Sequence, residues 1–391
     1  MRAKYLPALD GLRGVAITLV FVSHVHLESV LPKGFRGALP GSFGVTVFFF
    51  LSGYLITSLL RAEWSDTGDI SIRKFYLRRV RRILPPLYVV LTLAWILDAL
   101  GIPARQTTGL GISAILFYFF NYMVVLHPHL ENIVPAGLGV TWSLMVEEHF
   151  YFLFPFAYLL LQKRGVSAQR VVAILGGVCV LVLLWRLVLV YGLSNYSAEF
   201  SHWTYRATDT RFDSILFGCI MAVAANPWCS DKNEFLERNK LGLAVAGFAV
   251  IAISLLIRNG HYRETLRYTV EGVCLFPIFY YIVSTPTSKV ARFLQLPPMR
   301  WLGWTSYTIY LVSIISIDIV TKYTRLPPIA AGVVAAVGAG LFGELMRRLV
   351  ENPLRRLGKA GQPQVAGNKK IHGNANFIEA PQVMKRADDQ A

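Results

Sequence analysis

The feature that most constrains this chain is a succession of long apolar segments, each interrupted by only a few charges. A bilayer core about 30 Å thick needs about 20 apolar residues per helix, and only helices and closed barrels satisfy every backbone hydrogen bond in lipid. We therefore expect an all-α, polytopic transmembrane helical bundle. Eleven segments meet or approach the required length, at approximately residues 11–31, 41–60, 84–101, 109–127, 145–162, 171–192, 211–225, 241–257, 268–284, 301–321 and 328–349.

The composition excludes the usual soluble classes. Of the 391 residues, 54% are hydrophobic and 16% are charged, with a mean hydropathy of +0.47. A net charge of +16 is typical of some proteins that bind nucleic acids. Here, however, Lys and Arg lie between the apolar segments rather than in one basic domain. We therefore expect a lipid bilayer and no nucleic acid as partner. The four cysteines stand singly and none has a metal-ligand spacing, so no metal site is predicted.

The basic loops predict the orientation in the membrane. The loop at 61–82 has seven Lys and Arg residues and the region from 347 onward has nine, which places both in the cytoplasm. The first apolar segment has no signal-peptide cleavage pattern, so we expect it to remain as a helix with the N-terminus inside. Two cytoplasmic termini require an even number of crossings. We expect about ten crossing helices in the inner (cytoplasmic) membrane, with TGLGISAILFYFFNYMVVL as a re-entrant or interfacial segment.

The predicted organisation is one transmembrane domain at 1–358, followed by a polar tail at 359–391 that we expect to be disordered and cytoplasmic. Two functional classes fit such a domain. One is a membrane enzyme, and the other is a proton-coupled transporter or lipid flippase that uses ionisable residues inside its spans. The chain has no tandem repeat, which counts against an inverted-repeat transporter.

The stretch ALDGLRGVAITLVFVSHV places an arginine and a histidine on one apolar helix. Arg13 and His24 are eleven residues apart, which is ~16 Å along a helix and within ~20° of the same face. His24 is either a catalytic base or a histidine that hydrogen-bonds a neighbouring helix, because an ionisable group at this depth faces the bundle interior. Asp10 is predicted to cap the helix or to pair with Arg13.

A second cluster, FYLRRVRRILPPLY, contains four arginines. Arg78 with Arg81, and Arg79 with Arg82, are each three residues apart, so either pair forms a two-guanidinium clamp on one helix face. Guanidinium pairs suit phosphate oxygens, although positive charge on the cytoplasmic side would explain the same residues. The absence of lysine among them favours an anion site.

Two further motifs put charge into apolar helices. In TWSLMVEEHFYFLFP, Glu147 and Glu148 point about 100° apart, so we expect one to be a working carboxylate and the other to lie at the outer interface. In TDTRFDSILFGC, Arg211 and Asp213 are expected at the outer mouth of a helix, paired with each other or with the Glu147 region. The residues predicted to contact an acceptor are Trp142, Glu148, Arg211 and Asp213, with structural pairing as the other reading of the last two.

These motifs together resemble the acyltransferase-3 family of integral membrane O-acyltransferases, in the family's order and over about residues 5–356. Arg13 with His24 is similar to its Arg-x10-His pattern, Arg79 with Arg82 to its Arg-x-x-Arg pattern, and Glu147 to the acid of its Trp-Ser-Leu-x-x-Glu stretch. The resemblance implies a bundle of about ten helices that takes an acyl group, commonly acetyl, from cytoplasmic acyl-CoA. The acceptor it implies is a hydroxyl, often of a cell-envelope glycan.

In that reading His24 is the catalytic histidine, Arg13 supports it, and the arginine pair contacts the CoA phosphates. A base with a pKa near neutrality is needed to take the hydroxyl proton, and a carboxylate such as Glu147 or Asp10 would keep the histidine poised. Acyl-CoA is then a substrate and no tightly bound cofactor is expected. The acceptor is a glycan, a lipid-linked sugar or a small hydroxylated molecule.

The sequence departs from the family pattern at two positions. Ser313 stands where the family often has His, and His149 stands where it often has Gln. Both departures concern the pocket on the acceptor side.

Overall fold

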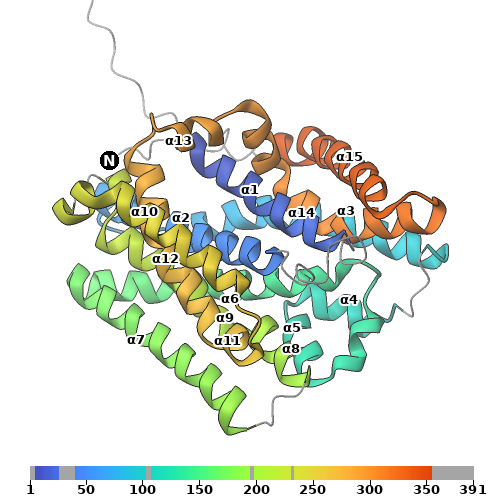
Figure 1. Cartoon of the computed structure of the whole chain (residues 1–391), viewed down its shortest axis with the longest axis horizontal. Coiled ribbons are helices and arrows are strands. Elements are labelled where there is room, and N and C mark those ends of the chain that lie inside the picture. The colour runs from blue at the N-terminus through green and yellow to red at the C-terminus, as the bar shows by residue number, and fades with distance from the viewer. Residues whose placement is uncertain (1–4, 26–39, 103–106, 194–197, 230–232, 355–391) are drawn as a thin grey trace, which may run out of the picture.

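The computed structural model describes residues 5–25, 40–102, 107–193, 198–229 and 233–354, and within these ranges all regular structure is helical (Figure 1). The predicted tail at 359–391 lies outside the described residues. Nine stretches of the described chain are long and apolar enough to cross a membrane: Gly41–Thr67, Ile72–Ala99, Leu138–Lys163, Ala168–Gly192, His202–Cys229, Glu234–Leu256, Leu266–Ser284, Pro297–Tyr323 and Pro328–Leu354.

The main helices in these stretches are α2 (Gly41–Thr67), α3 (Ile72–Ala99), α6 (Trp142–Lys163), α7 (Ala168–Leu187), α9 (Thr208–Ala224), α10 (Glu234–Leu256), α12 (Leu266–Ser284), α14 (Pro297–Tyr323) and α15 (Pro328–Met346). Shorter elements complete α6, α7 and α15: the 3-10 turn η4 (Leu138–Thr141) and the π turns η5 (Val188–Gly192) and η7 (Arg347–Glu351). The all-α transmembrane bundle predicted from the long apolar segments is confirmed.

The first helix, α1 (Pro7–His24), is 18 residues long. It begins with a proline in its first turn, where the missing N–H has no intrahelical partner to lose. It packs mainly on α14 and α2 and touches the short helix α13 (Lys289–Leu294) (Figure 1). Asp10 is buried between these helices, whereas Arg13 and His24 are partly exposed.

The segment TGLGISAILFYFFNYMVVL does not form one span. It folds into two short helices, α4 (Gly109–Leu116) and α5 (Phe120–Leu126), separated by Tyr118 in the left-handed region at φ 59°. Each helix is far shorter than the ~20 residues a crossing needs. The prediction that this apolar stretch is not a crossing helix is confirmed, and α1 with the nine candidate spans accounts for the expected number of about ten.

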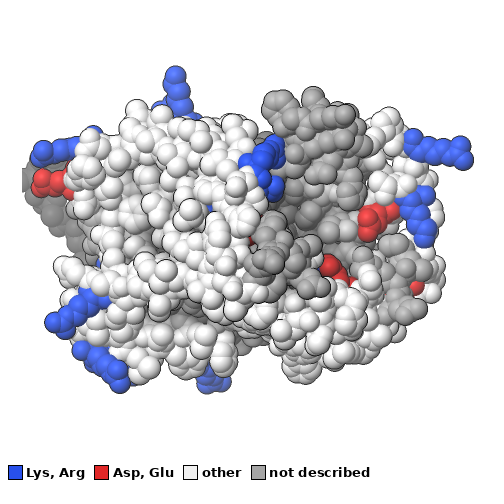
Figure 2. All heavy atoms as spheres, turned by 60° about the horizontal axis from the view of Figure 1, so that its bottom comes forward, with Lys and Arg blue, Asp and Glu red and all other residues white. Residues whose placement is uncertain are grey.

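The periphery of the bundle is apolar and the interior is partly polar. Large apolar side chains are exposed along α3, α7, α10 and α15, as expected for surfaces in contact with lipid tails. Figure 2 shows a broad uncharged face with Lys and Arg mostly toward its margins. The most enclosed candidate span is α2, which is 72% buried, whereas α10 is only 22% buried.

The remaining short helices connect these elements at the ends of the bundle. They are η3 (Pro128–Ile133), α8 (Ala198–Arg206), η6 (Pro227–Cys229) and α11 (Gly260–Glu264).

Candidate active site

A cavity that is partly open to solvent, with about 830 Å³ of empty space including the open part, lies among α1, α2, α3, α6 and α14. Its lining combines apolar side chains of α2 with charged groups from three other helices. The polar residues of this lining are Arg13, Ser52, Arg79, Arg82, Ser143, Glu147, Glu148, Tyr151, Ser306, Tyr307 and Tyr310. We call this space the inner cavity.

A second, more open space, with about 820 Å³ of empty volume including open solvent, adjoins the inner cavity at the end where α1 begins. We call it the vestibule; it is lined by Tyr5, Leu6, Leu9, Asp10, Arg13, Leu55, Leu59, Arg79, Arg82 and Trp228. Both spaces share Leu55 and the three arginines. The arginines therefore stand at the junction, where an anion entering from the vestibule meets them before the inner cavity.

Only one of the two predicted arginine pairs lies at this junction. Arg79 and Arg82 line both spaces, whereas Arg78 and Arg81 line neither. The Arg78 side chain is half exposed and pairs with Glu63 at 3.5 Å. Residues three apart share a helix face, so Arg79 and Arg82 point to the same side of α3. Arg78 and Arg81 each precede one of them by one residue and therefore point about 100° away from that side.

Asp10 holds the arginine of α1 in place. Its Oδ1 accepts a hydrogen bond from Arg13 Nη1 at 3.1 Å, and its Oδ2 accepts from the Trp304 indole at 3.0 Å and from the Tyr5 hydroxyl. No side chain caps the N-terminus of α1. Of the two roles predicted for Asp10, the structure therefore has the ion pair and not the cap.

The two glutamates of α6 both line the inner cavity. Glu147 accepts hydrogen bonds from the Ser52 hydroxyl at 2.9 Å and from the Tyr151 hydroxyl at 3.1 Å. The Tyr151 ring in turn lies 4.7 Å from the Arg79 guanidinium, which links the carboxylate to the arginine junction. The expectation that one glutamate lies at the outer interface is wrong, because the cavity extends around enough of α6 to meet both side chains.

His24 is not among the residues that line the inner cavity. Its Nδ1 is 3.0 Å from Ser313 Oγ, and Ser313 donates to the Tyr310 carbonyl one turn earlier on α14. Tyr310 lines the cavity, and its hydroxyl is 2.6 Å from Ser143 Oγ. Ser313 therefore connects the imidazole to a cavity-lining residue, and the Ser313 departure from the family pattern is in direct contact with His24.

Two other residues of the α6 motif have packing roles. Trp142 packs its ring against Tyr205 at 4.6 Å and against Phe49 at 6.3 Å, and only Phe49 of the three lines the cavity. His149 bonds to Thr208 at 2.7 Å and to the Tyr118 carbonyl at 2.9 Å. Trp142 therefore supports the cavity wall from behind rather than facing the space.

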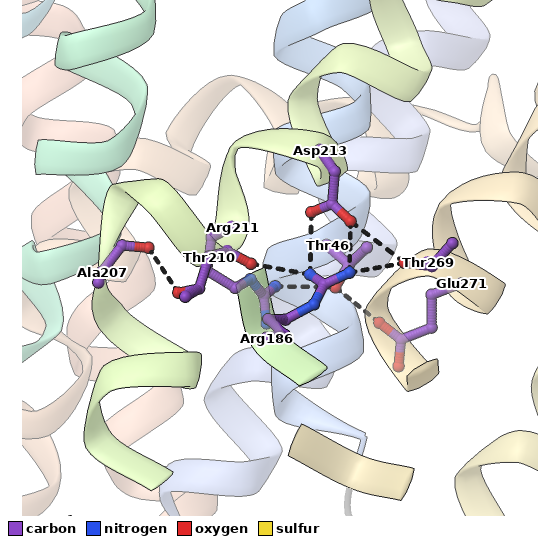
Figure 3. Close-up of polar contacts among 8 residues, drawn as sticks. All are labelled: Thr46, Arg186, Ala207, Thr210, Arg211, Asp213, Thr269 and Glu271. Carbon is purple, nitrogen blue, oxygen red and sulfur yellow. Dashed lines mark hydrogen bonds and ion pairs between the residues drawn. The ribbon is translucent and has the colours of Figure 1, made fainter. Parts of the chain in front are cut away.

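The residues Arg211 and Asp213 belong to a separate, fully buried ionic network (Figure 3). Asp213 accepts hydrogen bonds from both terminal nitrogens of Arg186, a residue of α7, at 3.1 and 2.6 Å. Arg211 donates to Thr46 of α2 at 3.1 Å and lies 3.7 Å from the Tyr268 ring. The predicted pairing of these two residues with each other or with the Glu147 region is wrong. Asp213 pairs with Arg186 of α7, and Arg211 hydrogen-bonds to Thr46 of α2.

The sequence analysis missed two residues that complete this network. Arg186 is in the last turn of α7 and Glu271 is in the second turn of α12, both inside apolar segments. Glu271 accepts a hydrogen bond from Thr46 at 2.7 Å and is 3.8 Å from Arg267. An ionisable residue within a span is itself a signal for a buried partner, and that signal would have found both.

The comparisons with known proteins agree with this architecture. The acyltransferase domain family, acyltransferase-3, matches residues 6–343. The chain belongs to the acyltransferase-3 family. It is therefore a multi-pass membrane protein of a family of acyltransferases. No solved structure matches it.

Several curated proteins are similar to this acyltransferase-3 member along most of its length. It is 28% identical over 367 residues to the peptidoglycan O-acetyltransferase OatA of Listeria monocytogenes. This alignment covers 91% of the present chain and 56% of the Listeria protein. It is 29% identical over 368 residues to the putative peptidoglycan O-acetyltransferase YrhL of Bacillus subtilis, with the same coverage. The O-acetyltransferase OatA of Staphylococcus aureus is 28% identical over 369 residues, covering 91% of this chain and 58% of that protein. The chain spans somewhat more than half the length of these relatives.

Proposed function

We propose that this chain is a membrane O-acetyltransferase that moves an acetyl group from acetyl-CoA to a hydroxyl of a cell-envelope glycan. The observation that carries the proposal is the junction of Arg13, Arg79 and Arg82 between the vestibule and the inner cavity. Three guanidinium groups at the entrance of a cavity lined by apolar side chains, hydroxyls and two carboxylates fit a donor with phosphates at one end and a neutral thioester at the other. The family match and the names of the relatives support the reaction class.

The donor enters from the vestibule, which in this proposal faces the cytoplasm. The arginines bind its phosphates, and the pantetheine arm extends past them into the inner cavity. The distance along α1 from Arg13 to His24 is ~16 Å, which an extended arm can span. Apolar side chains such as Val45 and Phe48 exclude water there, which protects the thioester from hydrolysis.

Transfer proceeds by attack of the acceptor oxygen on the thioester carbonyl carbon. A new C–O ester bond forms and the C–S bond breaks, with the electron pair leaving on sulfur. The proposed base, His24, takes the hydroxyl proton, and that proton is returned to the thiolate to give CoA. Histidine suits this step because its ordinary pKa is near neutrality.

The acceptor comes from the opposite end, where His24 and Ser313 meet. A hydroxyl that enters from that end reaches the imidazole before it reaches the inner cavity. The relatives carry names that refer to peptidoglycan, so a cell-wall glycan is the acceptor class we propose.

The test compares two double variants of the same helix in lipid nanodiscs. Arg79→Ala with Arg82→Ala removes junction arginines, and Arg78→Ala with Arg81→Ala removes the same charge from positions that line neither space. We expect the first variant to raise the KM for acetyl-CoA by about 100-fold, since each charge-assisted contact contributes about 1.5–3 kcal/mol, and the second to change it less than threefold. Release of CoA thiol measures both.

Equal effects of the two variants would mean that general positive charge, and not the junction, attracts the donor. If the wild-type protein consumes no acetyl-CoA with any glycan acceptor, the proposed reaction is wrong.

A further inference from the structure

The vestibule contains more than arginines. Beside its three guanidinium groups and the Asp10 carboxylate, it has four leucines, from α2, α1 and the residue before α1, and two aromatic rings, those of Tyr5 and Trp228. Phosphate binding needs only the cations, so the apolar and aromatic part of this lining remains unexplained by a phosphate site alone. Aromatic rings next to guanidinium groups are the chemistry that binds a nucleotide, with the base on a ring and the phosphates on the cations.

Trp228 reaches the vestibule from a part of the chain that the family motifs do not include. It is the middle residue of the single turn η6, which follows α9, and it is only partly exposed. Tryptophans that anchor a helix at the membrane interface sit in the headgroup layer at the protein surface. Trp228 instead lines the vestibule together with Arg13, Arg79 and Arg82.

A buried asparagine fixes the position of this turn. The Asn226 side chain is inaccessible, and its Oδ1 accepts hydrogen bonds from the Trp228 backbone N–H at 3.1 Å and from the Tyr54 hydroxyl at 2.7 Å. Its amide group donates to Ser58 Oγ at 2.9 Å. Two residues of α2 therefore hold the turn, and a ring held in advance loses little freedom when a ligand binds.

We propose that the vestibule is a nucleotide subsite in which Trp228, together with Tyr5, binds the adenine end of the acyl donor. This inference rests on the proposed function for the identity of the donor. It assigns the phosphates to the arginine junction and the base to the aromatic part of the vestibule. Trp228 thereby determines which acyl donors bind well: those that carry a nucleotide.

The first experiment measures binding without turnover. Adenosine 3′,5′-bisphosphate, the nucleotide part of CoA, is titrated by calorimetry into the full chain in nanodiscs. We expect Trp228→Ala to weaken binding about 5- to 150-fold, the usual effect of removing one aromatic partner of a base, and Trp228→Phe to weaken it less. The control is Trp95→Ala, because Trp95 is a tryptophan of α3 that is 51% exposed and lines neither space. It should leave the affinity unchanged.

The second experiment separates the base from the rest of the donor. We expect Trp228→Ala to raise the KM for acetyl-CoA while leaving the KM for S-acetylpantetheine, which has no nucleotide, at its wild-type value. An equal rise for both donors would overturn the proposal, since it would show a structural role for Trp228. So would an unchanged bisphosphate affinity in Trp228→Ala, or in Trp228→Phe if the alanine variant does not fold.

The outcomes also distinguish this inference from the proposed function. A protein that binds the bisphosphate through Trp228 but transfers no acetyl group would keep the subsite and refute the reaction. A protein that consumes acetyl-CoA but does not bind the bisphosphate would do the reverse.

Discussion

The buried pair of Arg186 and Asp213 allows a stability prediction with a built-in control. Both side chains are inaccessible, and two hydrogen bonds join them at 3.1 and 2.6 Å. Asp213→Ala would leave the Arg186 guanidinium with the Thr210 carbonyl at 2.8 Å and the Thr269 hydroxyl at 2.6 Å, both uncharged. The remaining carboxylate of the network, Glu271, already accepts from Thr46 and lies near a different arginine.

The expected cost follows from the uncompensated charge. Removal of one partner of a buried ion pair destabilises a protein by about 3–5 kcal/mol. The matched control is Glu234→Ala, which breaks the pair between Glu234 and Arg238, whose side chains are 87% and 80% exposed. Exposed pairs contribute about 0.2–1 kcal/mol. We therefore expect Asp213→Ala to lower the Tm by about 5–10 °C and Glu234→Ala by no more than about 2 °C.

The assay uses cysteines that the chain already has. Cys179 and Cys219 are buried, so a fluorogenic thiol reagent reports their exposure as the protein unfolds on heating. The double variant Arg186→Met with Asp213→Leu should recover most of the lost stability, because it removes both charges together. Equal Tm losses in Asp213→Ala and Glu234→Ala, or a double variant less stable than the single one, would refute the argument from buried charge.

Three further predictions concern the site and its packing. His24→Ala should lower the rate of acetyl transfer by about 10²- to 10⁴-fold, the usual contribution of a general base, while bisphosphate affinity measured by calorimetry stays unchanged. Glu147→Gln should reduce turnover at least tenfold with a Tm within about 2 °C of wild type, because an amide keeps one acceptor for Ser52 or Tyr151 but loses the negative charge. Gly53→Ala should lower the Tm, since its new Cβ would lie 2.0 Å from the Ile215 carbonyl oxygen. The control Gly338→Ala, with open space around it, should raise the Tm slightly. A Gly53→Ala protein as stable as wild type would contradict the close packing.

The apolar segments could be predicted because a bilayer imposes a length and a composition on each of them. Ten of the eleven expected segments correspond to long helices of the structure, counting α1. The segment at 109–127 was excluded as a crossing from loop charges alone, and the structure divides it at Tyr118. A break of this kind depends on one residue in the left-handed region, which hydropathy does not register.

The site was predicted less completely, because residue spacing gives the face of one helix and not its neighbours. Spacing placed Arg79 with Arg82 on one face, and the structure puts both at the junction. It did not give the partner of Asp213, because Arg186 comes from α7, 27 residues away in sequence. His24 was predicted on the same helix face as Arg13, but it is not among the residues that line the inner cavity, whereas Tyr310 and Ser143 of two other helices are.

The position of α2 explains how one apolar helix serves two polar systems. Val45, Phe48, Phe49, Ser52 and Leu55 recur at helical spacing and line the inner cavity. The face offset by one residue meets α9 instead, where Thr46 joins the ionic network and Gly53 admits the backbone of α9. A helix that is enclosed on all sides is apolar all round, so its sequence resembles that of a lipid-facing span. Because the network and the cavity wall are fixed to the same helix, a change on the α9 side of α2 also moves the wall that the acyl donor would contact.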